Sequence, residues 1–260
     1  MDELVEKQVG KNKAIIITGA SSGLGAGMAE KFAKMGYNLG ICARRIERLQ
    51  ELKANILTHS PNVQIEVRSL DVADYDAVFA TFNEFANTFG HIDRVVVNAG
   101  IGDGRAIGKG HFEINRKTAE INFISALAQC EAAMQIFREQ NSGHLVAISS
   151  MSAMRGLPKH LTTYAASKAA LAHLAEGIRA DMLKSKLPIK VTTVYPGYIR
   201  TELNEGAKAL PFEVDVETGT REMVEVIESD ILEAYVPKMP WVLLGKAMKT
   251  LPLHIVNKLS

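Results

Sequence analysis

Tyr164 and Lys168 are the residues whose types and spacing are best suited to chemistry. If they lie on one helix, four residues apart, their side chains emerge one turn apart on the same face. An ammonium close to a phenol favours the phenolate, so we expect Lys168 to lower the pKa of Tyr164 from about 10 toward neutral pH. Tyr164 would then serve as a general acid or base for a hydroxyl or carbonyl group. A serine hydroxyl nearby could stabilise the charge that develops on the same oxygen.

Tyrosine and lysine at this spacing also occur on many solvated helices, so the pair alone has little weight. Other motifs accompany it in this order: Thr18 through Gly25, Asn98-Ala99-Gly100, Asn122, Ser149-Ser150 and Pro196-Gly197. Together these motifs resemble the short-chain dehydrogenase/reductase family over about residues 11–205. The resemblance implies hydride transfer between a nicotinamide cofactor and a carbonyl or secondary alcohol. It assigns the catalytic roles to Asn122, Ser150, Tyr164 and Lys168.

Short apolar runs alternate with segments of helical spacing, which predicts parallel βαβ units in an α/β fold. We expect a Rossmann-type doubly wound parallel sheet flanked by helices. The predicted strands are 13–18, 38–43, 63–70, 92–97, 144–149 and 190–195, and the predicted helices are 26–35, 46–57, 77–89, 118–138, 162–183 and 217–235. We expect a single domain over 1–260, with the motifs in 11–205 and a substrate lid and C-terminal extension in 206–260.

A glycine-rich turn joins the first predicted strand to the first predicted helix. Backbone amides in such a turn can approach a pyrophosphate at the positive end of the helix, although a tight turn that merely needs small residues has the same composition. The spacing is GxxxGxG rather than the commoner GxGxxG, and it is the pattern of the family that the chain resembles. The cofactor contacts expected here are Gly19, Ser21, Ser22, Gly23, Leu24 and Gly25.

Arg44 and Arg45 follow the second predicted strand, and the first carboxylate after them is Glu47. An acidic residue near this point holds the ribose 2′-hydroxyl of NAD, whereas a basic residue accommodates the 2′-phosphate of NADP. The arginines therefore favour NADP(H) over NAD(H). The alternative is a solvated pair of charges at the start of the next helix.

The resemblance assigns further cofactor contacts after the later strands. An aspartate in the position of Asp71 binds the adenine amino group in the family, although Asp71 could instead cap the helix near Tyr75. The asparagine matched by Asn98 steadies the central sheet. The expected cofactor contacts after these strands are Asp71, Val72, Asn98, Ala99, Gly100, Pro196, Gly197, Ile199 and Thr201, in addition to Tyr164 and Lys168.

Two of the catalytic assignments leave alternatives open. Ser150 lies one position farther from Tyr164 than the family's serine usually does, and Ser149 lies two positions farther, so Ser150 is the better match and Ser149 the alternative. In the family, an asparagine on the helix that carries Asn122 holds a water that relays protons to the lysine. A buried cap or a solvent-exposed side chain would also explain an asparagine there.

The composition excludes several classes of function. The formal net charge of +1 gives no general attraction to nucleic acid. Cys42 and Cys130 lie in apolar runs, which favours buried packing in a reduced, cytoplasmic setting. The start of the chain has no secretory signal pattern, and no apolar run is long enough to span a bilayer. The histidines lack ligand spacing, so we expect no metal site.

Substrate selectivity in this fold lies mostly in the loops after the strands and in the segment beyond Thr201, and the resemblance fades after about residue 205. Leu203, Leu210, Phe212 and Met223 suggest a hydrophobic small-molecule substrate. The tail 241–260 predicts two brief amphipathic helices. They would form a flap over the substrate pocket or against a neighbouring subunit, or, less favoured, a weak contact with an anionic membrane surface. The family also implies a homodimer or homotetramer through helices 118–138 and 162–183. A catalytically idle NADP-binding protein on the same fold is the alternative function.

Overall fold

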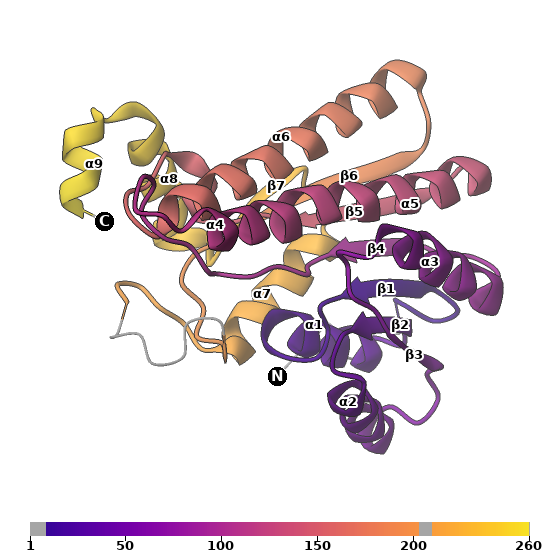
Figure 1. Cartoon of the computed structure of the whole chain (residues 1–260). Helices are drawn as coiled ribbons and strands as arrows, with labels where there is room; N and C mark the ends of the chain where they lie inside the picture. Colours follow the sequence, from indigo (N-terminus) through magenta and orange to yellow (C-terminus); the bar gives the residue numbers. More distant parts are fainter. Residues whose placement is uncertain (1–8, 203–209, 260) are drawn as a thin grey trace.

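Seven parallel strands form one sheet at the centre of the protein, in the order β3-β2-β1-β4-β5-β6-β7 (Figure 1). The computed structural model describes residues 9–202 and 210–259. The strands are β1 (Ala14–Thr18), β2 (Asn38–Ala43), β3 (Ile65–Ser69), β4 (Arg94–Val97), β5 (Gly143–Ile148), β6 (Ile189–Pro196) and β7 (Glu233–Val236). The Rossmann-type doubly wound sheet expected from the sequence is confirmed.

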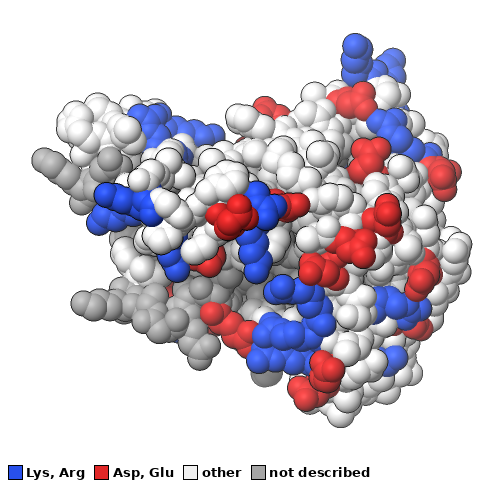
Figure 2. All heavy atoms as spheres, viewed as in Figure 1, with Lys and Arg blue, Asp and Glu red and all other residues white. Residues whose placement is uncertain are grey.

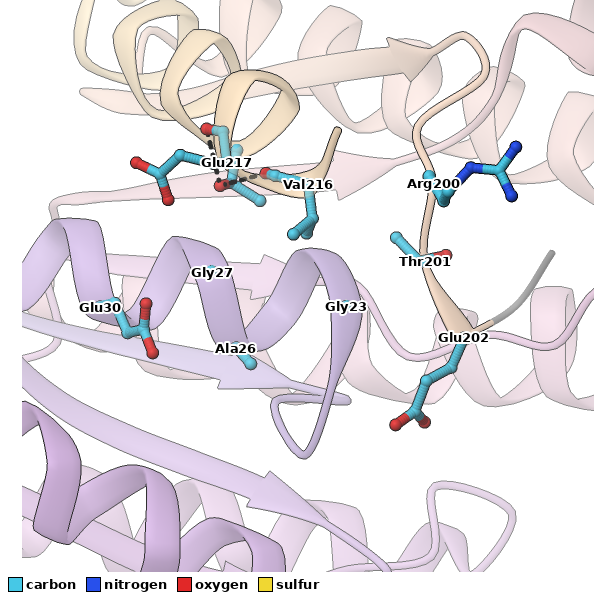
Figure 3. A pocket seen from close by; sticks show the side chains of 10 residues that line it. Gly23, Ala26, Gly27, Glu30, Arg200, Thr201, Glu202, Val216 and Glu217 are labelled. Atoms are coloured by element: carbon cyan, nitrogen blue, oxygen red, sulfur yellow. Dashed lines mark hydrogen bonds between the residues drawn. The ribbon is translucent and has the colours of Figure 1, made fainter. Parts of the chain in front are cut away.

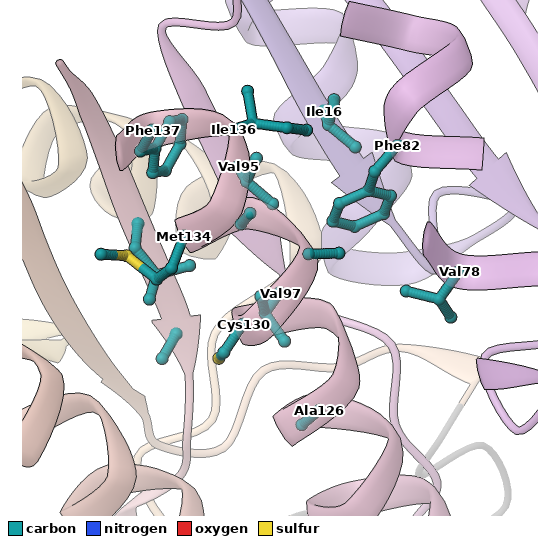
Figure 4. Packing of buried hydrophobic residues seen from close by; sticks show 14 of the residues in the cluster. Ile16, Val78, Phe82, Val95, Val97, Ala126, Cys130, Met134, Ile136 and Phe137 are labelled. Atoms are coloured by element: carbon teal, nitrogen blue, oxygen red, sulfur yellow. The ribbon is translucent and has the colours of Figure 1, made fainter. Parts of the chain in front are cut away.

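Helices cover both faces of the sheet, which is why its strands are continuous apolar runs rather than alternating ones. The helices are α1 (Gly23–Lys34), α2 (Ile46–His59), α3 (Tyr75–Phe89), α4 (Phe112–Ala119), α5 (Ser125–Gln140), α6 (Leu161–Ser185), α7 (Val216–Glu228), α8 (Lys238–Thr250) and α9 (Leu253–Leu259). One core cluster joins the sheet to α3, α5 and α6, as Phe82, Cys130 and Phe137 illustrate in Figure 4. A second cluster joins the opposite face to α1, α2 and α7. Cys42 and Cys130 are both buried and free, as expected.

The strand order reverses between β1 and β4, and this arrangement determines where a ligand can bind. Successive strands from β1 lead outward to β2 and β3, whereas β4 begins the other half of the sheet. The connections that follow β1 and β4 therefore leave the sheet in opposite directions and open a crevice at its carboxyl edge. The glycine-rich turn follows β1, and Asn98-Ala99-Gly100 follows β4.

The last strand, β7, corrects the sequence prediction. A helix was expected over 217–235, but α7 ends at Glu228 and Glu233–Val236 pairs in parallel with β6. Asp230, with φ of 56°, lies in the turn between them. Ala234 and Val236 are buried while Glu233 is exposed, which is the alternation of an edge strand. The region 206–260 therefore completes the sheet as well as following the motif-bearing core.

A π-helical turn, η1 (Glu120–Ile124), interrupts the helix expected over 118–138. The helical segment begins earlier, with α4 at Phe112, and continues through η1 into α5. Such turns are rare and occur frequently at functional sites. Asn122, one of the predicted catalytic residues, lies in this turn.

The two short helices predicted for the tail are present as α8 and α9. Trp241 of α8 is buried, and its ring lies edge-on to Tyr198, with 5.3 Å between centroids. A Cβ atom added to Gly197 would lie 2.1 Å from the indole, so only glycine permits this approach. Helix α8 thus packs on the carboxyl end of β6. Of the residues expected near a substrate, Met223 is instead part of the core and Leu203 lies outside the described residues.

A buried network of polar side chains lies at the opposite, amino end of the strands. Nη1 of Arg94 lies 2.5 Å from Oε1 of Glu228, and the Tyr37 hydroxyl donates to the same carboxylate at 3.0 and 3.1 Å. Nε of Arg94 donates to Nδ1 of His144 at 3.1 Å. The Arg94 guanidinium also stacks over the rings of Phe32 and Tyr37, at 5.4 and 5.6 Å from their centroids. This network links β2, β4, β5 and the end of α7.

Within residues 9–202 and 210–259, no helix is long and apolar enough to cross a membrane. The same residues contain no group of three or more histidine, cysteine or acidic side chains that could hold a metal ion.

Candidate active site

Tyr164 and Lys168 lie in the first two turns of α6, at the carboxyl edge of the sheet. Lys168 is almost completely buried, with 5% of its surface exposed. Its Nζ donates to the carbonyl oxygen of Ile148, the last residue of β5, at 2.9 Å. The helix therefore carries a buried ammonium up to the end of the central strands.

The two candidate serines occupy different positions. Ser149 is buried, and its hydroxyl donates to the main-chain oxygen of Lys168 at 2.8 Å, so it fixes α6 to β5. The side chain of Ser150 lies near the phenol of Tyr164 and acts to lower the pKa of that phenol. Its Oγ also accepts a hydrogen bond from the amide of Ser152 at 3.2 Å and caps the short 3₁₀ helix η2 (Met151–Met154). Only Ser150 has its hydroxyl beside the tyrosine.

Burial favours the neutral forms of both Tyr164 and Lys168, so it raises the pKa of the phenol and lowers the pKa of the ammonium. The pKa of Tyr164 is raised by desolvation, and the nearby side chain of Ser150 opposes part of that rise. The pKa of Lys168 is lowered from 10.5 to about 8 by desolvation. The expectation that Lys168 lowers the pKa of Tyr164 is therefore not met in this structure. Desolvation by burial is the largest cause of both shifts.

Asn122 lies beside Lys168, and its side chain is nearly fully bonded. Its Oδ1 accepts from the amide of Ile101 at 2.8 Å, and its Nδ2 donates to the Ile101 carbonyl at 2.9 Å and to Oγ of Ser167 at 3.3 Å. A Cβ atom added to Gly100 would lie 3.1 Å from Oδ1 of Asn122 and 3.4 Å from Nζ of Lys168. Gly100, Asn122 and Lys168 thus converge at the end of β4, and the alternative of a solvent-exposed asparagine is wrong.

The glycine-rich turn needs glycine at three positions for conformational or steric reasons. Gly19 and Gly23 have φ values of 66° and 53°, in the left-handed region that favours glycine. A Cβ atom on Gly25 would lie 2.5 Å from the carbonyl oxygen of Gly19. The spacing GxxxGxG therefore matches three separate demands of the turn. Ser21, Ser22 and Leu24 complete it, and α1 begins at Gly23 with its amino end toward the crevice.

Arg45 reaches back from the end of β2 to this turn. Its Nη2 donates to Oγ of Ser22 at 2.8 Å and to Oγ of Ser21 at 3.2 Å. Its Nη1 lies 3.1 Å from Oε2 of Glu202, whose Oε1 lies 2.5 Å from Nη1 of Arg48. Arg44 is exposed and makes no hydrogen bond or ion pair with any described residue. In Figure 2, a group of basic side chains lies at the lower centre of the molecule, with acidic side chains beside it.

Sequence reasoning missed Arg48 and Glu202. Arg48 had a local signal, because it follows Arg45 by three residues and lies on the same side of α2. Glu202 had none, because it is 157 residues away from Arg45 along the chain.

The residues after β3 and β4 hold the edge of the sheet. Oδ1 of Asp71 accepts from the amide of Ala73 at 3.1 Å, while Asp74 caps α3 by accepting from Ala77, so Asp71 is not the cap of this helix. Val72 is buried. Nδ2 of Asn98 donates to the main-chain oxygen of Thr18 at 2.9 Å, which ties the end of β4 to the end of β1, with Ala99 and Gly100 following.

The segment after β6 passes in front of the glycine-rich turn. Ile199 is buried and forms an isolated bridge with Val214. Thr201 lies so close to the turn that a Cβ atom on Gly23 would be 3.3 Å from that of Thr201. Pro196 ends β6, and Gly197 is covered by Trp241, a contact that the sequence did not indicate.

A cavity of about 310 Å³ lies between α1, α7 and the segment after β6 (Figure 3). It is lined by Gly23, Ala26, Gly27, Glu30, Arg200, Thr201, Glu202, Val216, Glu217 and Thr220. In Figure 3 the side chain of Glu202 extends away from Val216 and Glu217. The cavity thus adjoins the amino end of α1.

Comparison with known proteins identifies the family. The model described as short chain dehydrogenase matches residues 13–218. An uncharacterized oxidoreductase of Mycobacterium tuberculosis (strain ATCC 25618 / H37Rv) is 44% identical over 246 residues, which cover 95% of this chain and 96% of that protein. The chain belongs to the short-chain dehydrogenase family, a family of oxidoreductases.

Two solved structures show the same fold. The NADPH-dependent 3-quinuclidinone reductase from Rhodotorula rubra superposes with a TM-score of 0.76 at 23% identity, covering 87% of this chain and 88% of that one. A short chain dehydrogenase/reductase from Burkholderia phymatum, in complex with NAD, gives 0.79 at 19% identity, covering 94% and 92%. The first of these proteins is described as NADPH-dependent and the second was solved with NAD, on the same fold.

Proposed function

We propose that this protein is an NADP(H)-dependent oxidoreductase that transfers hydride between the nicotinamide and a carbonyl or secondary alcohol. The observation that carries the proposal is the convergence of Ser150, Tyr164, Lys168 and Asn122 beside the crevice at the switch point of the sheet. The bound nicotinamide supplies the hydride chemistry. The chain contributes binding, orientation and proton transfer.

Tyr164 gives or takes the proton at the reacting oxygen. Because burial raises its pKa, the phenol holds its proton at neutral pH, and this state is the one that can protonate a carbonyl oxygen. The Ser150 hydroxyl, which lies near the phenol, binds the same oxygen and stabilises developing negative charge. These two roles favour the direction of carbonyl reduction.

Lys168 and Asn122 return the proton to Tyr164. With its pKa lowered to about 8, Lys168 can release and regain a proton near neutral pH. It also lies where a cofactor ribose could accept its hydrogen bond, next to Gly100. The Asn122 side chain is engaged with Ile101, so we assign the water of the relay to the main chain of the π-helical turn.

The cofactor is assigned to NADP(H) from the position of Arg45. This side chain is held over the hydroxyls of Ser21 and Ser22, with Arg48 close by. A cluster of guanidinium and hydroxyl donors suits a phosphate, whereas the ribose hydroxyl of NAD calls for a carboxylate. Arg44 adds a further exposed positive charge.

The substrate is assigned to the hydrophobic carbonyls or alcohols. Met151, Met154, Tyr195 and Trp241 form an apolar cluster directly after Ser150, and α8 covers it. The region 206–260 serves as a lid in this proposal, with Trp241 fixing it. The packing of Trp241 favours a flap over a membrane contact, because that side chain is not available to lipid.

We also assign the protein to the cytoplasm and to a homodimer or homotetramer. Leu127 on α5 and Leu183 on α6 are exposed apolar side chains, 38% and 73% accessible, on the helices expected to meet a partner copy. Sedimentation of the full chain at micromolar concentration tests this assembly, and a 28.4 kDa species alone would contradict it.

Consumption of NADPH with a panel of aromatic ketones, aliphatic ketones and ketosteroids tests the activity. We expect turnover with at least one apolar class and a weaker response with NADH. Replacing Arg45 with Ala should weaken NADPH binding about tenfold to a hundredfold and NADH binding much less. Tight NADPH binding with no turnover across the panel would instead favour the catalytically idle alternative.

A further inference from the structure

Glu202 is the one carboxylate among the described residues that holds Arg45, and it lies at the position where a cofactor phosphate is expected. Its Oε2 lies 3.1 Å from Nη1 of Arg45 and its Oε1 lies 2.5 Å from Nη1 of Arg48. The two arginines therefore share one anion. The remaining donors of Arg45 bind the hydroxyls of Ser21 and Ser22. A phosphate at this place would meet the same two guanidinium groups that the carboxylate now occupies.

The Glu202 carboxylate can be displaced, because it and the two arginines are exposed to water. The side chains of Arg45, Arg48 and Glu202 are each 45% exposed, and ion pairs of such exposure contribute little to stability. Hydrogen bonds from Arg48 and Arg45 lower the pKa of the Glu202 carboxyl, so it is ionised throughout the neutral range. The competitor is therefore always charged. A phosphate carries more charge and more acceptor atoms than the carboxylate it would replace.

The connection of Glu202 to the rest of the site gives this contact a further consequence. It directly follows Thr201, whose side chain lies against Gly23 of the glycine-rich turn. The pair formed by Glu202 and Arg45 thus ties the segment after β6 to the end of β2. Binding at the arginines and the position of this segment are then linked, and such linkage is reciprocal.

We propose that Glu202 is an internal anion that occupies Arg45 and Arg48 until the 2′-phosphate of NADP(H) replaces it, and that it thereby determines how strongly the chain prefers the phosphorylated cofactor. The inference rests on the proposed use of NADP(H). Glu202 is a specificity-determining residue here and takes no part in the chemical step.

Calorimetric titration of the full chain with NADPH, NADH, adenosine 2′-monophosphate and adenosine 5′-monophosphate tests the proposal without any turnover. Glu202→Gln should bind NADPH and the 2′-monophosphate about twofold to fivefold more tightly, while the two ligands without a 2′-phosphate change less than twofold. Glu51→Gln is the matched control. It removes one negative charge from α2, where Glu51 is exposed and bonds to no described residue, and its affinities should stay at those of the wild type.

The double variant Arg45→Ala/Glu202→Gln shows whether the two side chains act together. The gain from Glu202→Gln should shrink when Arg45 is absent, because the groups compete through that guanidinium. Weaker NADPH binding by Glu202→Gln, or an equal change for all four ligands, would overturn the proposal. If the wild type binds NADPH no better than NADH, the proposed cofactor is wrong. If the wild type shows the preference and Arg45→Ala loses it, but Glu202→Gln does not alter it, only the role of Glu202 fails.

Discussion

Two buried cations lie at opposite ends of the same sheet, and their surroundings differ. Arg94, at the amino end, is 7% exposed and pairs with a carboxylate, an imidazole and two aromatic rings. Lys168, at the carboxyl edge, is 5% exposed and donates to the carbonyl oxygen of Ile148, with no carboxylate of the described residues paired with it.

The difference supports the proposal that the amino end stabilises the fold and that the carboxyl edge holds the active site. A buried charge that is fully paired contributes a defined structure, whereas one without a counter-charge destabilises its own ionised form. Residues with such unrelieved shifts are concentrated at functional sites. The paired Arg94 at the amino end therefore stabilises the fold, whereas Lys168 at the carboxyl edge, without a counter-charge, lowers its stability.

The largest expected effect is on turnover. Tyr164→Phe removes the phenolic proton while keeping the ring, so kcat should fall about a hundredfold to ten-thousandfold. NADPH affinity, measured by calorimetry, should stay within a few-fold of wild type. A variant that kept wild-type kcat on any substrate of the ketone panel would show that the carboxyl edge does not work through this residue.

Arg94→Ala should be the most damaging change to stability. It leaves the Glu228 carboxylate buried without its partner, and removing one member of a buried pair costs about 3–5 kcal/mol. Urea unfolding followed by circular dichroism measures the loss. Arg94→Lys retains the charge but loses the planar contacts with Phe32 and Tyr37. Its stability should therefore lie between that of the wild type and that of Arg94→Ala. If Arg94→Ala lost less than about 1 kcal/mol of unfolding free energy, Arg94 would not be a stabilising cation and would not differ from Lys168 in this respect.

Lys168→Met should have the opposite effect on stability at pH 7 while abolishing turnover. Lowering the lysine pKa from 10.5 to about 8 on folding corresponds to about 3 kcal/mol of destabilisation at neutral pH. The unfolded chain binds more protons than the folded one between these values, so wild-type stability rises with pH from about 8 to 10.5. The advantage of the methionine variant should shrink over that window. If the wild type and Lys168→Met were equally stable at pH 7, the cost of burying the Lys168 charge would be offset by other interactions of that charge.

The effect that is smallest at neutral pH concerns His144, because it develops only in acid. Burial, followed by the charge of Arg94, lowers its pKa from 6.5 to about 3, with Asp230 opposing and Lys190 adding to the decrease. The neutral ring accepts from Arg94, and its Nε2 lies 2.8 Å from the hydroxyl of Thr192.

The sign follows from the proton balance. Below pH 6.5 the unfolded chain binds a proton that the folded chain refuses, so stability falls toward pH 3, by about 1.4 kcal/mol per pH unit at most. His144→Gln should flatten this slope in unfolding measurements between pH 6 and 4, and an unchanged slope would assign it to other groups.

Most of the fold could be predicted from local patterns. Apolar runs such as Ala14–Thr18 and the glycines of the turn after it are short-range signals, and both were interpreted correctly. The helix predicted through Tyr235 was wrong because four residues of strand are too short for periodicity to distinguish from a helix end. The π-helical turn at Asn122 also has no sequence signature of its own.

Some features of the candidate site could also be predicted from local spacing, and others could not. Spacing alone was enough to place Tyr164 and Lys168 on one face of α6, with Ser150 upstream. The direction of the Tyr164 pKa could not be predicted, because it depends on how much water the packed helices exclude. Trp241 on Gly197 and Glu202 on Arg45 were likewise missed, since each pairs residues far apart along the chain.

The sequence by itself determined the first six strands, the family and the chemical types of the side chains at the carboxyl edge. It could do so because periodicity, glycine conformations and i to i+4 spacing act over a few residues. The tertiary structure alone decided which of Ser149 and Ser150 meets the tyrosine, that Lys168 is a buried cation without a described carboxylate partner, and that Glu202 holds the arginines. Those features depend on desolvation and on charges brought together across the fold, and local sequence does not encode distance between such groups.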